Sequence, residues 1–411
     1  MSAPASSPRR IGVIGGGIIG TCSAFFLARL ARQRSLNVQI TLIEGSDIAA
    51  GASGKAGGLL ALDWHGPSTA SLAELSYSLH AQLAKELDGS ARWGYRKLDT
   101  LSISADLSSS SAAGGKASRV RKLKESDLFN WLNKDLLTST EVLGSEETTA
   151  QVHPELFTRA IANEAQKEGV EVVYGTAQSL ERLEGADDGY RVSVSPRTAT
   201  SGESSAETAR SLEFDQVVVA AGPWTGRLLS TLGPIASRAG RAKAIRGSRA
   251  HSIVVRSPEG KTLPAQALFT SIKEQKGRHA EPEIYNRPDG TAYACGPTDD
   301  SDLPVRASDV TISRAAIASL ISQTAQLAPD YLDSTAEGGA TVEREQACYL
   351  PVGSGDPVIG QIEGTGEGKG VWVASGHSCW GICNGPGTGQ VVAELLLDGK
   401  ASSANISQLR P

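Results

Sequence analysis

Cysteine, methionine and aromatic residues are scarce in this sequence. Its 411 residues include five cysteines, one methionine and 5% aromatic residues. The cysteines are odd in number and irregularly spaced: Cys22, Cys295, Cys348, Cys379 and Cys383. This pattern excludes a disulfide-stapled secreted scaffold and predicts reduced thiols in a cytoplasmic protein. No histidine–cysteine cluster completes a zinc site around Cys379 and Cys383, so we expect no metal.

The sequence also lacks an excess of basic charge and a long apolar run. Lysine and arginine total 40 against 45 aspartate and glutamate, which gives a net charge of −5. This balance argues against a nucleic-acid partner or an anionic membrane surface. No apolar stretch is long enough to span a bilayer, so no transmembrane segment is expected. The 40% hydrophobic content suits a globular protein with a large core.

Glycine is abundant, and its most informative cluster lies near the start. Residues 11–20 read IGVIGGGIIG, a buried strand that runs into a glycine turn and then a helix. Gly15, Gly17 and Gly20 fill the GxGxxG spacing of a dinucleotide-binding turn. Gly15 permits the tight turn, Gly17 lets a pyrophosphate approach the backbone, and Gly20 lets the helix pack close to the strand. The helix N-terminus would then attract the phosphates.

The residues after this turn support the same interpretation. An apolar helix continues to Arg34, and a second strand over residues 38–43 ends at Glu44. This carboxylate has nearly the spacing expected of an acid that binds a ribose. One alternative is an ordinary strand–helix–strand unit with an unrelated glutamate. Another is a NAD-dependent dehydrogenase, although such a protein needs only this first glycine turn.

The strand and helix patterns recur in the middle and at the end of the chain. The periodicity predicts helices over 71–87, 154–168 and 387–397, and strands over 170–174, 215–222 and 370–376. Gly399 is placed to end the last helix. Two Ser-, Gly- and Thr-rich segments, 108–116 and 196–211, are expected to be surface insertions. We therefore expect a discontinuous α/β nucleotide-binding domain from 1–96, 148–236 and 345–411, and a second domain from 97–147 and 237–344.

Several further motifs accompany the first glycine turn. They are ASGKAGGL (52–59), HPELFTRAI (153–161), VVVAAGPW (217–224), PEIYNRPDG (282–290), CYLPVGSGDPVIG (348–360) and GHSCWGICNGPGTG (376–389). With these motifs the sequence resembles the D-amino-acid oxidase, glycine oxidase and sarcosine oxidase superfamily of FAD enzymes, in particular its fungal glycine-oxidase-like branch. The resemblance covers nearly the whole chain. It implies a Rossmann-like FAD-binding domain of the glutathione-reductase type and a substrate domain with a mostly antiparallel sheet.

The resemblance also implies which residues bind FAD. The set comprises the first turn and its acid, the 53–59 loop, a waist segment and the C-terminal loop: Gly15, Gly17, Ile18, Ile19, Gly20, Glu44, Gly45, Ser53, Gly54, Lys55, Ala56, Gly57, Gly58, Leu59, Gln178, Ala221, Gly222, Trp224, Cys348, Gly376, Cys379, Trp380, Gly381 and Ile382. The helix predicted after Gly387 would point its positive end at this loop and favour the reduced flavin. Cys348 falls where sarcosine-oxidase-like relatives attach FAD through a thioether. A non-covalent site with Cys348 as a buried apolar residue is the favoured alternative.

The implied reaction is oxidation of the C–N bond of an amine or amino acid by hydride transfer to flavin N5. Oxygen would accept the electrons and give H2O2, and no catalytic acid–base pair is required if the amine binds neutral. The protein must position the C–H bond and exclude water. An FAD dehydrogenase with another acceptor is an alternative, because Ala294 falls where relatives place an oxygen-activating lysine. A further alternative is an FAD-binding interaction or trafficking protein without oxidase activity.

The substrate pocket departs from the family pattern. Glycine-oxidase-like sequences bind the substrate carboxylate with an arginine at the position of Leu350, so a carboxylate is not assured here. Arg287 could replace that arginine or could be a surface charge. Tyr285 and Tyr349 could cap the pocket or pack in the core. Trp64 and His65 follow the 53–59 loop and could line the substrate cavity.

Overall fold

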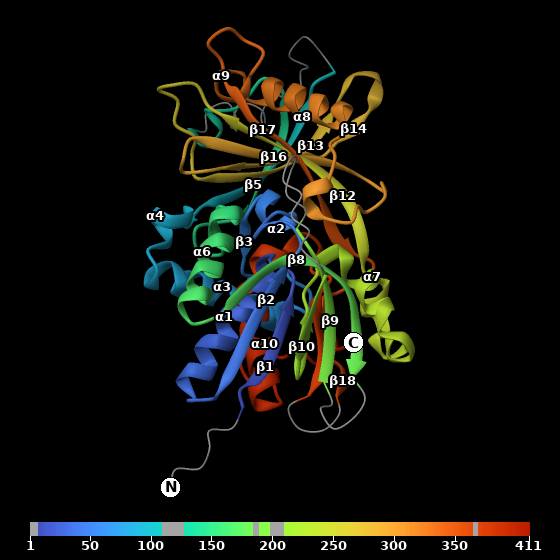
Figure 1. Ribbon diagram of the computed structural model, residues 1–411. Coiled ribbons are helices and arrows are strands. Elements are labelled where there is room, and N and C mark those ends of the chain that lie inside the picture. The colour runs from blue at the N-terminus through green and yellow to red at the C-terminus, as the bar shows by residue number, and fades with distance from the viewer. Residues whose placement is uncertain (1–6, 109–126, 184–188, 198–208, 365–368) are drawn as a thin grey trace.

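A computed structural model describes residues 7–108, 127–183, 189–197, 209–364 and 369–411. The chain forms two large sheets, one above the other in Figure 1, and a small three-stranded sheet. Most of the two expected surface insertions, 109–116 and 198–208, lies outside the described residues.

The lower sheet has eight strands and a parallel centre. Its order is β10 (Arg210–Phe214), β9 (Gly189–Pro196), β8 (Glu171–Leu183), β2 (Val38–Glu44), β1 (Arg9–Ile14), β11 (Gln216–Val219), β19 (Gly370–Ser375) and β18 (Val358–Gly364). Ile14 on β1 is level with Ile43 on β2 and with Val219 on β11. The carboxyl ends of these three strands therefore meet at one edge, where α/β sheets bind their ligands.

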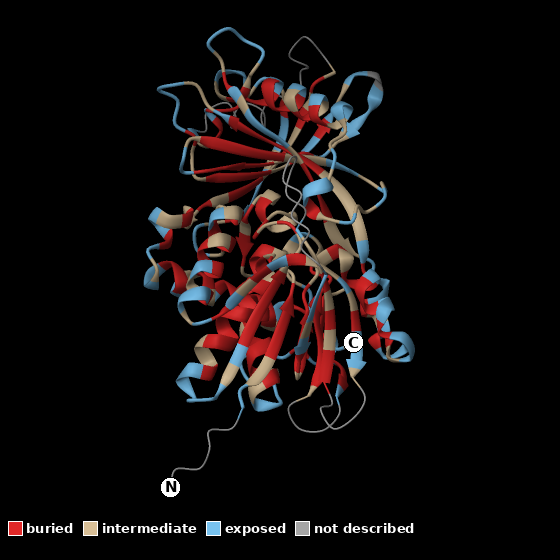
Figure 2. Cartoon of the chain, viewed as in Figure 1, coloured by how far each residue is buried: buried red, intermediate tan, exposed pale blue. Residues whose placement is uncertain are grey.

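Four helices cover one face of the lower sheet: α1 (Ile18–Gln33), α3 (Ala70–Glu86), α6 (Pro154–Lys167) and α10 (Gly381–Asp398). Their apolar side chains form one buried cluster with the sheet, including Phe25, Leu72, Phe157 and Val391 against Leu42. Full burial of such a side chain stabilises the fold by roughly 1.5–3 kcal/mol. On the other face, α7 (Thr225–Leu229) and the 3-10 segment η3 (Ser230–Ala244) pack on the same sheet. Figure 2 shows the strands buried between these layers.

The upper sheet is mostly antiparallel, as the resemblance implies. Its order is β17 (Thr341–Val352), β12 (Arg246–Arg256), β16 (Thr291–Asp299), β15 (Glu283–Asn286), β13 (Gln266–Lys273), β5 (Asp99–Asp106) and β6 (Leu137–Gly144), and β14 (His279–Ala280) pairs with β13. Helices α8 (Arg314–Leu327) and α9 (Pro329–Leu332) cover its outer face (Figure 1). Leu320 of α8 and Leu268 of β13 belong to its core cluster. The expected α/β fold class is confirmed.

The predicted domain boundary at residue 345 falls inside β17. This strand pairs with β12 from Thr341 to Val352, so its C-terminal half belongs to the upper sheet as well. The small sheet is β3 (Leu59–Ala61), β7 (Thr149–Gln151) and β4 (Arg96–Lys97). The remaining short helices are α2 (Ala52–Lys55), α4 (Gly89–Trp93), η1 (Asp127–Phe129), η2 (Gly222–Trp224), η4 (Gln275–Gly277), η5 (Ala307–Asp309), η6 (Ser378–Trp380) and η7 (Ser407–Leu409).

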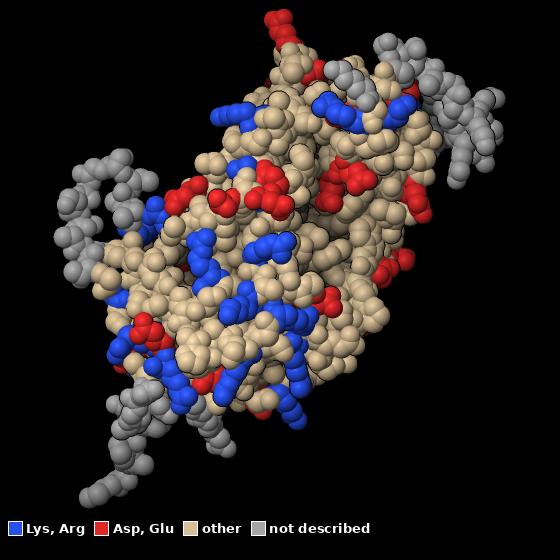
Figure 3. Space-filling model, turned by 90° about the vertical axis from the view of Figure 1, so that its right-hand side faces the viewer, with Lys and Arg blue, Asp and Glu red and all other residues tan. Residues whose placement is uncertain are grey.

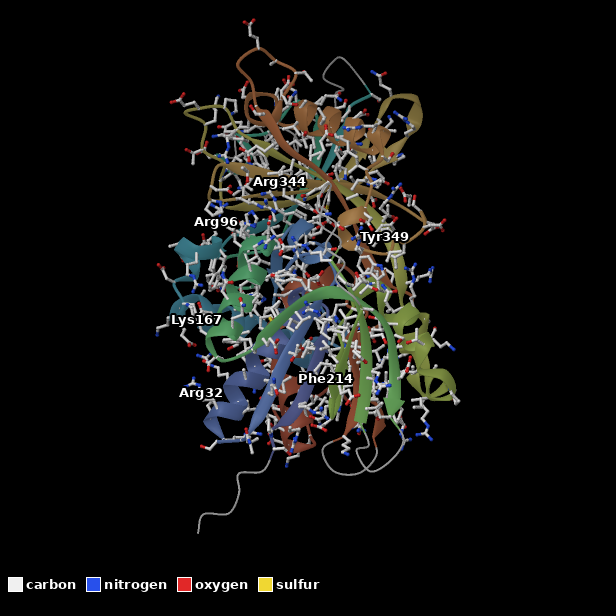
Figure 4. The ribbon with its side chains drawn as sticks, in the orientation of Figure 1. Arg32, Arg96, Lys167, Phe214, Arg344 and Tyr349 are labelled. Atoms are coloured by element: carbon white, nitrogen blue, oxygen red, sulfur yellow. The ribbon has the colours of Figure 1, made fainter. Side chains whose placement is uncertain are left out.

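Arginine side chains connect the two halves of the molecule. Arg96 donates to Gln151 Oε1 at 2.7 Å and to the Asn286 carbonyl at 2.8 Å, which joins the small sheet to β15. Arg344 of β17 donates to Glu155 of α6 at 2.7 Å. Figure 4 shows Arg96 and Arg344 at the level where the upper sheet meets the helices below. These contacts hold the upper sheet over the carboxyl ends of the lower strands.

The surface carries charges of both signs. On the side shown in Figure 3, basic side chains gather below a belt of acidic ones. Among the described residues, no helix is long and apolar enough to cross a membrane.

Candidate active site

A cavity of about 530 Å³ lies between the two sheets. Its lining combines the first glycine turn, the end of β2, the 51–59 loop, the end of β11 and the C-terminal loop with side chains of the upper sheet. Segments from the head, middle and tail of the chain therefore meet at one site. The volume is typical of pockets that bind small molecules.

The first turn requires glycine at two positions for different reasons. Gly15 has a φ of +117°, and a Cβ atom there would lie 2.3 Å from the Ala220 carbonyl oxygen. A Cβ atom at Gly20 would lie 1.8 Å from the Gly15 carbonyl oxygen. A Cβ atom at Gly17 would meet only Ser53 Oγ, at 3.0 Å, and Gly17 lines the cavity. Gly15 and Gly20 thus permit the turn, whereas Gly17 leaves space for a ligand.

Glu44 ends β2 at the cavity wall. Its Oε2 accepts from the Gly16 backbone N–H at 2.7 Å, and its Oε1 accepts from the Ser46 N–H at 2.7 Å. Burial raises the pKa of this carboxyl group, and the two backbone donors oppose that rise. Each carboxylate oxygen has a further lone pair that can accept a hydroxyl, as a ribose would require.

The 51–59 loop links the first turn to the upper sheet. Ser53 Oγ accepts from the Ile18 N–H at 2.8 Å, at the start of α1. Lys55 Nζ donates to the Ala347 carbonyl of β17 at 2.9 Å. A Cβ atom at Gly57 would lie 2.4 Å from the Tyr285 ring, so this ring packs directly on the loop. The loop therefore forms the floor between the cofactor turn and the upper sheet.

The last helix begins earlier than the sequence predicts. We expected it to start near Gly387, because the run GICNGPGTG is typical of a loop. The structure places η6 at Ser378–Trp380 and starts α10 at Gly381, so the prediction of its start is wrong. No acidic residue and no side-chain cap is found in its first turn. Its positive end therefore remains free beside the cavity, whose lining includes residues 376–382.

Side chains of α3 supply the hydrogen bonds that this glycine- and proline-containing helix lacks. Pro386 has no N–H for the Ile382 carbonyl, and His80 Nε2 lies 2.9 Å from that carbonyl oxygen instead. Ser76 Oγ donates to the Cys383 carbonyl at 2.6 Å and accepts from the N–H after Pro386 at 3.0 Å. Hydrogen bonds from the neighbouring helix α3 therefore allow a helix where the local sequence predicts a loop.

The cavity brings together most of the residues implied for FAD. Those that line it are Gly15, Gly17, Ile18, Ile19, Glu44, Gly45, Ser53, Lys55, Ala56, Gly57, Gly58, Leu59, Gln178, Ala221, Gly222, Trp224, Cys348, Gly376, Cys379, Trp380, Gly381 and Ile382. Gln178 sits at a β-bulge of β8, where the ladder with β9 shifts register. Gly20 and Gly54 lie behind the lining, in close backbone contact with Gly15 and Ala49.

Of the pocket residues suggested by the sequence, Tyr285 and Leu350 line the cavity. Arg287 does not. It is buried beneath the wall, with Nη1 3.3 Å from His153 Nε2, Nη2 donating to the Ala56 carbonyl at 3.4 Å, and its guanidinium 5.4 Å from the Tyr293 ring centre. Its position supports a structural role.

Tyr349, Trp64 and His65 also lie outside the lining. The Tyr349 hydroxyl donates to the Asp302 carbonyl at 2.7 Å, in the segment that follows β16. The Trp64 ring packs behind Phe269 at 5.4 Å. The centre of the His65 ring lies 4.4 Å from that of the Trp380 ring at an interplanar angle of 59°, and burial lowers the pKa of its imidazole.

The lining also includes upper-sheet residues that were missed from the sequence, among them Phe269, Glu283, Tyr293 and Cys295. The Tyr285 hydroxyl donates to the Glu283 carboxylate, and Cys295 Sγ donates to it at 3.7 Å. Alternation along a strand could have identified Glu283, since residues two apart share a face and Tyr285 was already a candidate.

The residues present fit FAD. The turn leaves open space at Gly17, Glu44 offers a carboxylate to a ribose, and two helix N-termini approach the same cavity. Among the described residues, no group of three or more His, Cys, Asp or Glu side chains could hold a metal ion.

Fold and site together define a dinucleotide-binding oxidoreductase with a second sheet over its cofactor cavity. The sequence profile described as FAD dependent oxidoreductase matches residues 10–395, so the chain belongs to the DAO family of FAD-dependent oxidoreductases. The resemblance seen in the sequence is thereby confirmed. FAD is the cofactor, which removes the NAD alternative.

Two fungal relatives match the chain along its length. The Schizosaccharomyces pombe protein C1F5.03c is 39% identical over 99% of this chain and 98% of its own length. TDA3 of Saccharomyces cerevisiae is 29% identical over 98% of this chain and 94% of its own length. Both names describe them only provisionally as oxidoreductases.

Solved structures share the fold at low sequence identity. Glycine oxidase from Geobacillus kaustophilus has a TM-score of 0.71 at 19% identity and covers 98% of both chains. L-proline dehydrogenase from P. horikoshii has a TM-score of 0.69 at 17% identity and covers 98% of this chain and 97% of its own. At this identity the likeness establishes the fold alone.

Proposed function

We propose that this FAD-dependent oxidoreductase oxidises the C–N bond of an amine or amino acid. The observation that carries the proposal is a single cavity lined on one side by the cofactor turns and on the other by the aromatic side chains of the upper sheet. The fold neighbours named for glycine oxidase and L-proline dehydrogenase act on amino acids, which supports the same substrate class.

Bound FAD supplies the hydride acceptor, and the chain supplies position and electrostatics. Phe269, Tyr285 and Tyr293 form an apolar wall that orients a small substrate and excludes water. The uncapped N-terminus of α10 favours negative charge at its end of the cavity.

We propose O2 as the electron acceptor. Ala294, where the family resemblance implies a lysine, is buried in the upper core and carries no charge. Lys55 supports the proposal from another side of the cavity, because this residue lines the cavity and its ammonium group lies near Cys348. A positive charge favours electron transfer to oxygen.

An anaerobic mixing experiment tests both parts of the proposal. The purified holoprotein is mixed with a panel of primary and N-methylated amines and amino acids, and flavin absorbance near 450 nm is followed. Bleaching by any compound supports C–N oxidation. Readmission of air should restore the colour with one H2O2 per turnover, whereas a bleached flavin stable in air would indicate a dehydrogenase. Absence of bleaching across the panel would contradict the proposal and favour the interaction role.

A further inference from the structure

The upper wall of the cavity carries a carboxylate that has no described cation beside it. Glu283 lies on β15, and its carboxylate accepts from the Tyr285 hydroxyl and from Cys295 Sγ. Among the described residues, no lysine or arginine forms an ion pair with Glu283. Burial raises the pKa of its carboxyl group. A half-buried carboxylate of this kind is costly to hold in its charged form, and a cation that enters the cavity would offset that cost.

The rings around Glu283 favour the same kind of ligand. The Tyr285 ring centre lies 5.8 Å from Tyr293 and 6.1 Å from Phe269, and Trp64 extends the row 5.4 Å behind Phe269. Aromatic faces are electron-rich and attract cations, including methylated ammonium groups. Tyr293 already holds the guanidinium of Arg287 in this way, from outside the cavity lining.

A substrate carboxylate finds no comparable partner on this wall. Leu350 lines the cavity, and its side chain offers neither charge nor hydrogen bond to a carboxylate. The buried Arg287 is directed to His153 and the Ala56 carbonyl.

The cationic residues among the described lining lie elsewhere in the cavity. They are Lys55, Arg227 and Arg306. Lys55 donates to β17, and its titratable neighbours are the Cys348 thiol and the Glu155 carboxylate. Arg227 binds the carbonyls of Leu303 and Pro304, in the segment that reaches Ser46 through Ser308. That segment places Arg227 and Arg306 near the end of β2, on the dinucleotide side.

We propose that the substrate is recognised through a cationic nitrogen by Glu283 and the aromatic wall, with no substrate carboxylate required. The inference rests on the proposed C–N oxidation and narrows its substrate to amines. Hydride leaves the carbon atom that is bonded to the nitrogen, and this nitrogen must be neutral for that step. An ammonium group that contacts Glu283 can transfer one N–H proton to the carboxylate, which leaves a neutral amine and a carboxylic acid.

Calorimetric titration of the holoprotein tests the recognition without turnover. The probes are tetramethylammonium chloride, tert-butanol as a neutral analogue of similar size, and sodium acetate as an anion. We expect tetramethylammonium to bind more tightly than the other two, and Glu283→Gln to weaken it by about tenfold or more. The matched control is Glu281→Gln, which removes an exposed carboxylate on the same segment and should change affinity by less than about twofold.

Two results would overturn the inference. One is equal tetramethylammonium affinity in the wild type and in Glu283→Gln, with flavin content and thermal midpoint of the variant unchanged. The other is tighter binding of acetate than of tetramethylammonium. Flavin bleaching by amine and amino-acid pairs of the same carbon skeleton separates this test from that of the proposed function. Bleaching only by the amino acids would retain C–N oxidation and refute recognition without a substrate carboxylate. Glu283-dependent cation binding without any bleaching would retain the recognition site and refute C–N oxidation.

Discussion

Gly17 and Gly20 share one motif, but a methyl group would have a different effect at each position. Gly17 has a φ of −78° and a ψ of 179°, which alanine also adopts, and its Cβ would meet only the movable Ser53 hydroxyl. We expect Gly17→Ala to keep the apo fold and to weaken FAD binding by about tenfold or more, because the methyl group projects into ligand space. Fluorescence titration of apoprotein with FAD measures the change.

Gly20→Ala is the matched comparison for that variant. Its methyl group would collide with the Gly15 carbonyl, so the helix must move away from the turn. We expect the free energy of unfolding to fall by about 1–3 kcal/mol, as measured by denaturant unfolding of the apoproteins. Equal loss of stability in both variants would contradict the separate roles.

Cys348 is predicted not to hold FAD covalently. Its side chain is buried, and burial raises the pKa of the thiol to about 11, although the nearby Lys55 ammonium opposes the rise. A thiol in this state is a weak nucleophile at neutral pH. We expect acid precipitation to release all the yellow colour from the polypeptide, and Cys348→Ala to retain one FAD per chain. Colour that remains with the precipitated wild type, but not with the variant, would establish a thioether.

The role of a residue could be predicted from the sequence where backbone sterics determine it. It could not be predicted where contacts with residues distant in the sequence determine it. The glycine positions and Glu44 follow from spacing alone. The position of Arg287 outside the lining depends on His153, which is 134 residues away. Strand alternation from Tyr285 could have placed Glu283 on the cavity face, but it could not show that Glu283 has no ion-pair partner among the described residues, because that depends on distant segments.

At the scale of elements, α3 and α10 form one unit. The break that Pro386 makes in α10 is bridged by Ser76 and His80 of α3. This unit positions the free end of α10 at the cavity. The periodicity of each helix predicts its existence, but the start of α10 depends on hydrogen bonds from its neighbour, and helix boundaries set in this way cannot be derived from one segment alone.

His80 should make the fold sensitive to acid. Burial lowers the pKa of its imidazole from 6.5 to about 4. Above pH 6.5 the His80 imidazole is neutral in both the folded and the unfolded state, so its titration does not change the free energy of unfolding. Between pH 6.5 and 4 the unfolded chain takes up a proton that the folded chain excludes, so the free energy of unfolding falls, by roughly 3 kcal/mol at pH 4.

His80→Gln keeps a donor for the Ile382 carbonyl and removes the titration. We expect its unfolding free energy to decline less than that of the wild type between pH 6.5 and 4, as measured by urea unfolding across that range. His279→Gln, at an exposed histidine, should follow the wild type. Identical declines in the wild type and in His80→Gln would show that His80 is not excluded from protonation in the folded state.

At the scale of the whole molecule, the lower sheet could be anticipated better than the upper one. Its central strands are continuous apolar runs separated by helices and glycine turns, all of which are local signals. The upper sheet pairs Gln266 with Asp99 in parallel, and β17 with β12, across long intervals of chain. No local pattern specifies which distant strands pair, so the sequence could predict an antiparallel second sheet only through family resemblance.

Segments that are distant in the sequence converge on one cofactor, so FAD binding should stabilise all of them together. At an FAD concentration of about 100 times Kd, mass action stabilises the bound state by about 2.7 kcal/mol. Backbone amides that exchange by local opening of the cavity lining should therefore slow by up to about 100-fold. We expect this slowing together in segments 15–19, 51–58 and 376–382, because all three line the cavity. The exposed turn around η4 should be unaffected.

Hydrogen-exchange mass spectrometry of apo and holo protein measures all four regions at once. Slowing confined to 15–19 would mean that the other two segments do not close on the same ligand, and the single-cavity architecture would then be wrong.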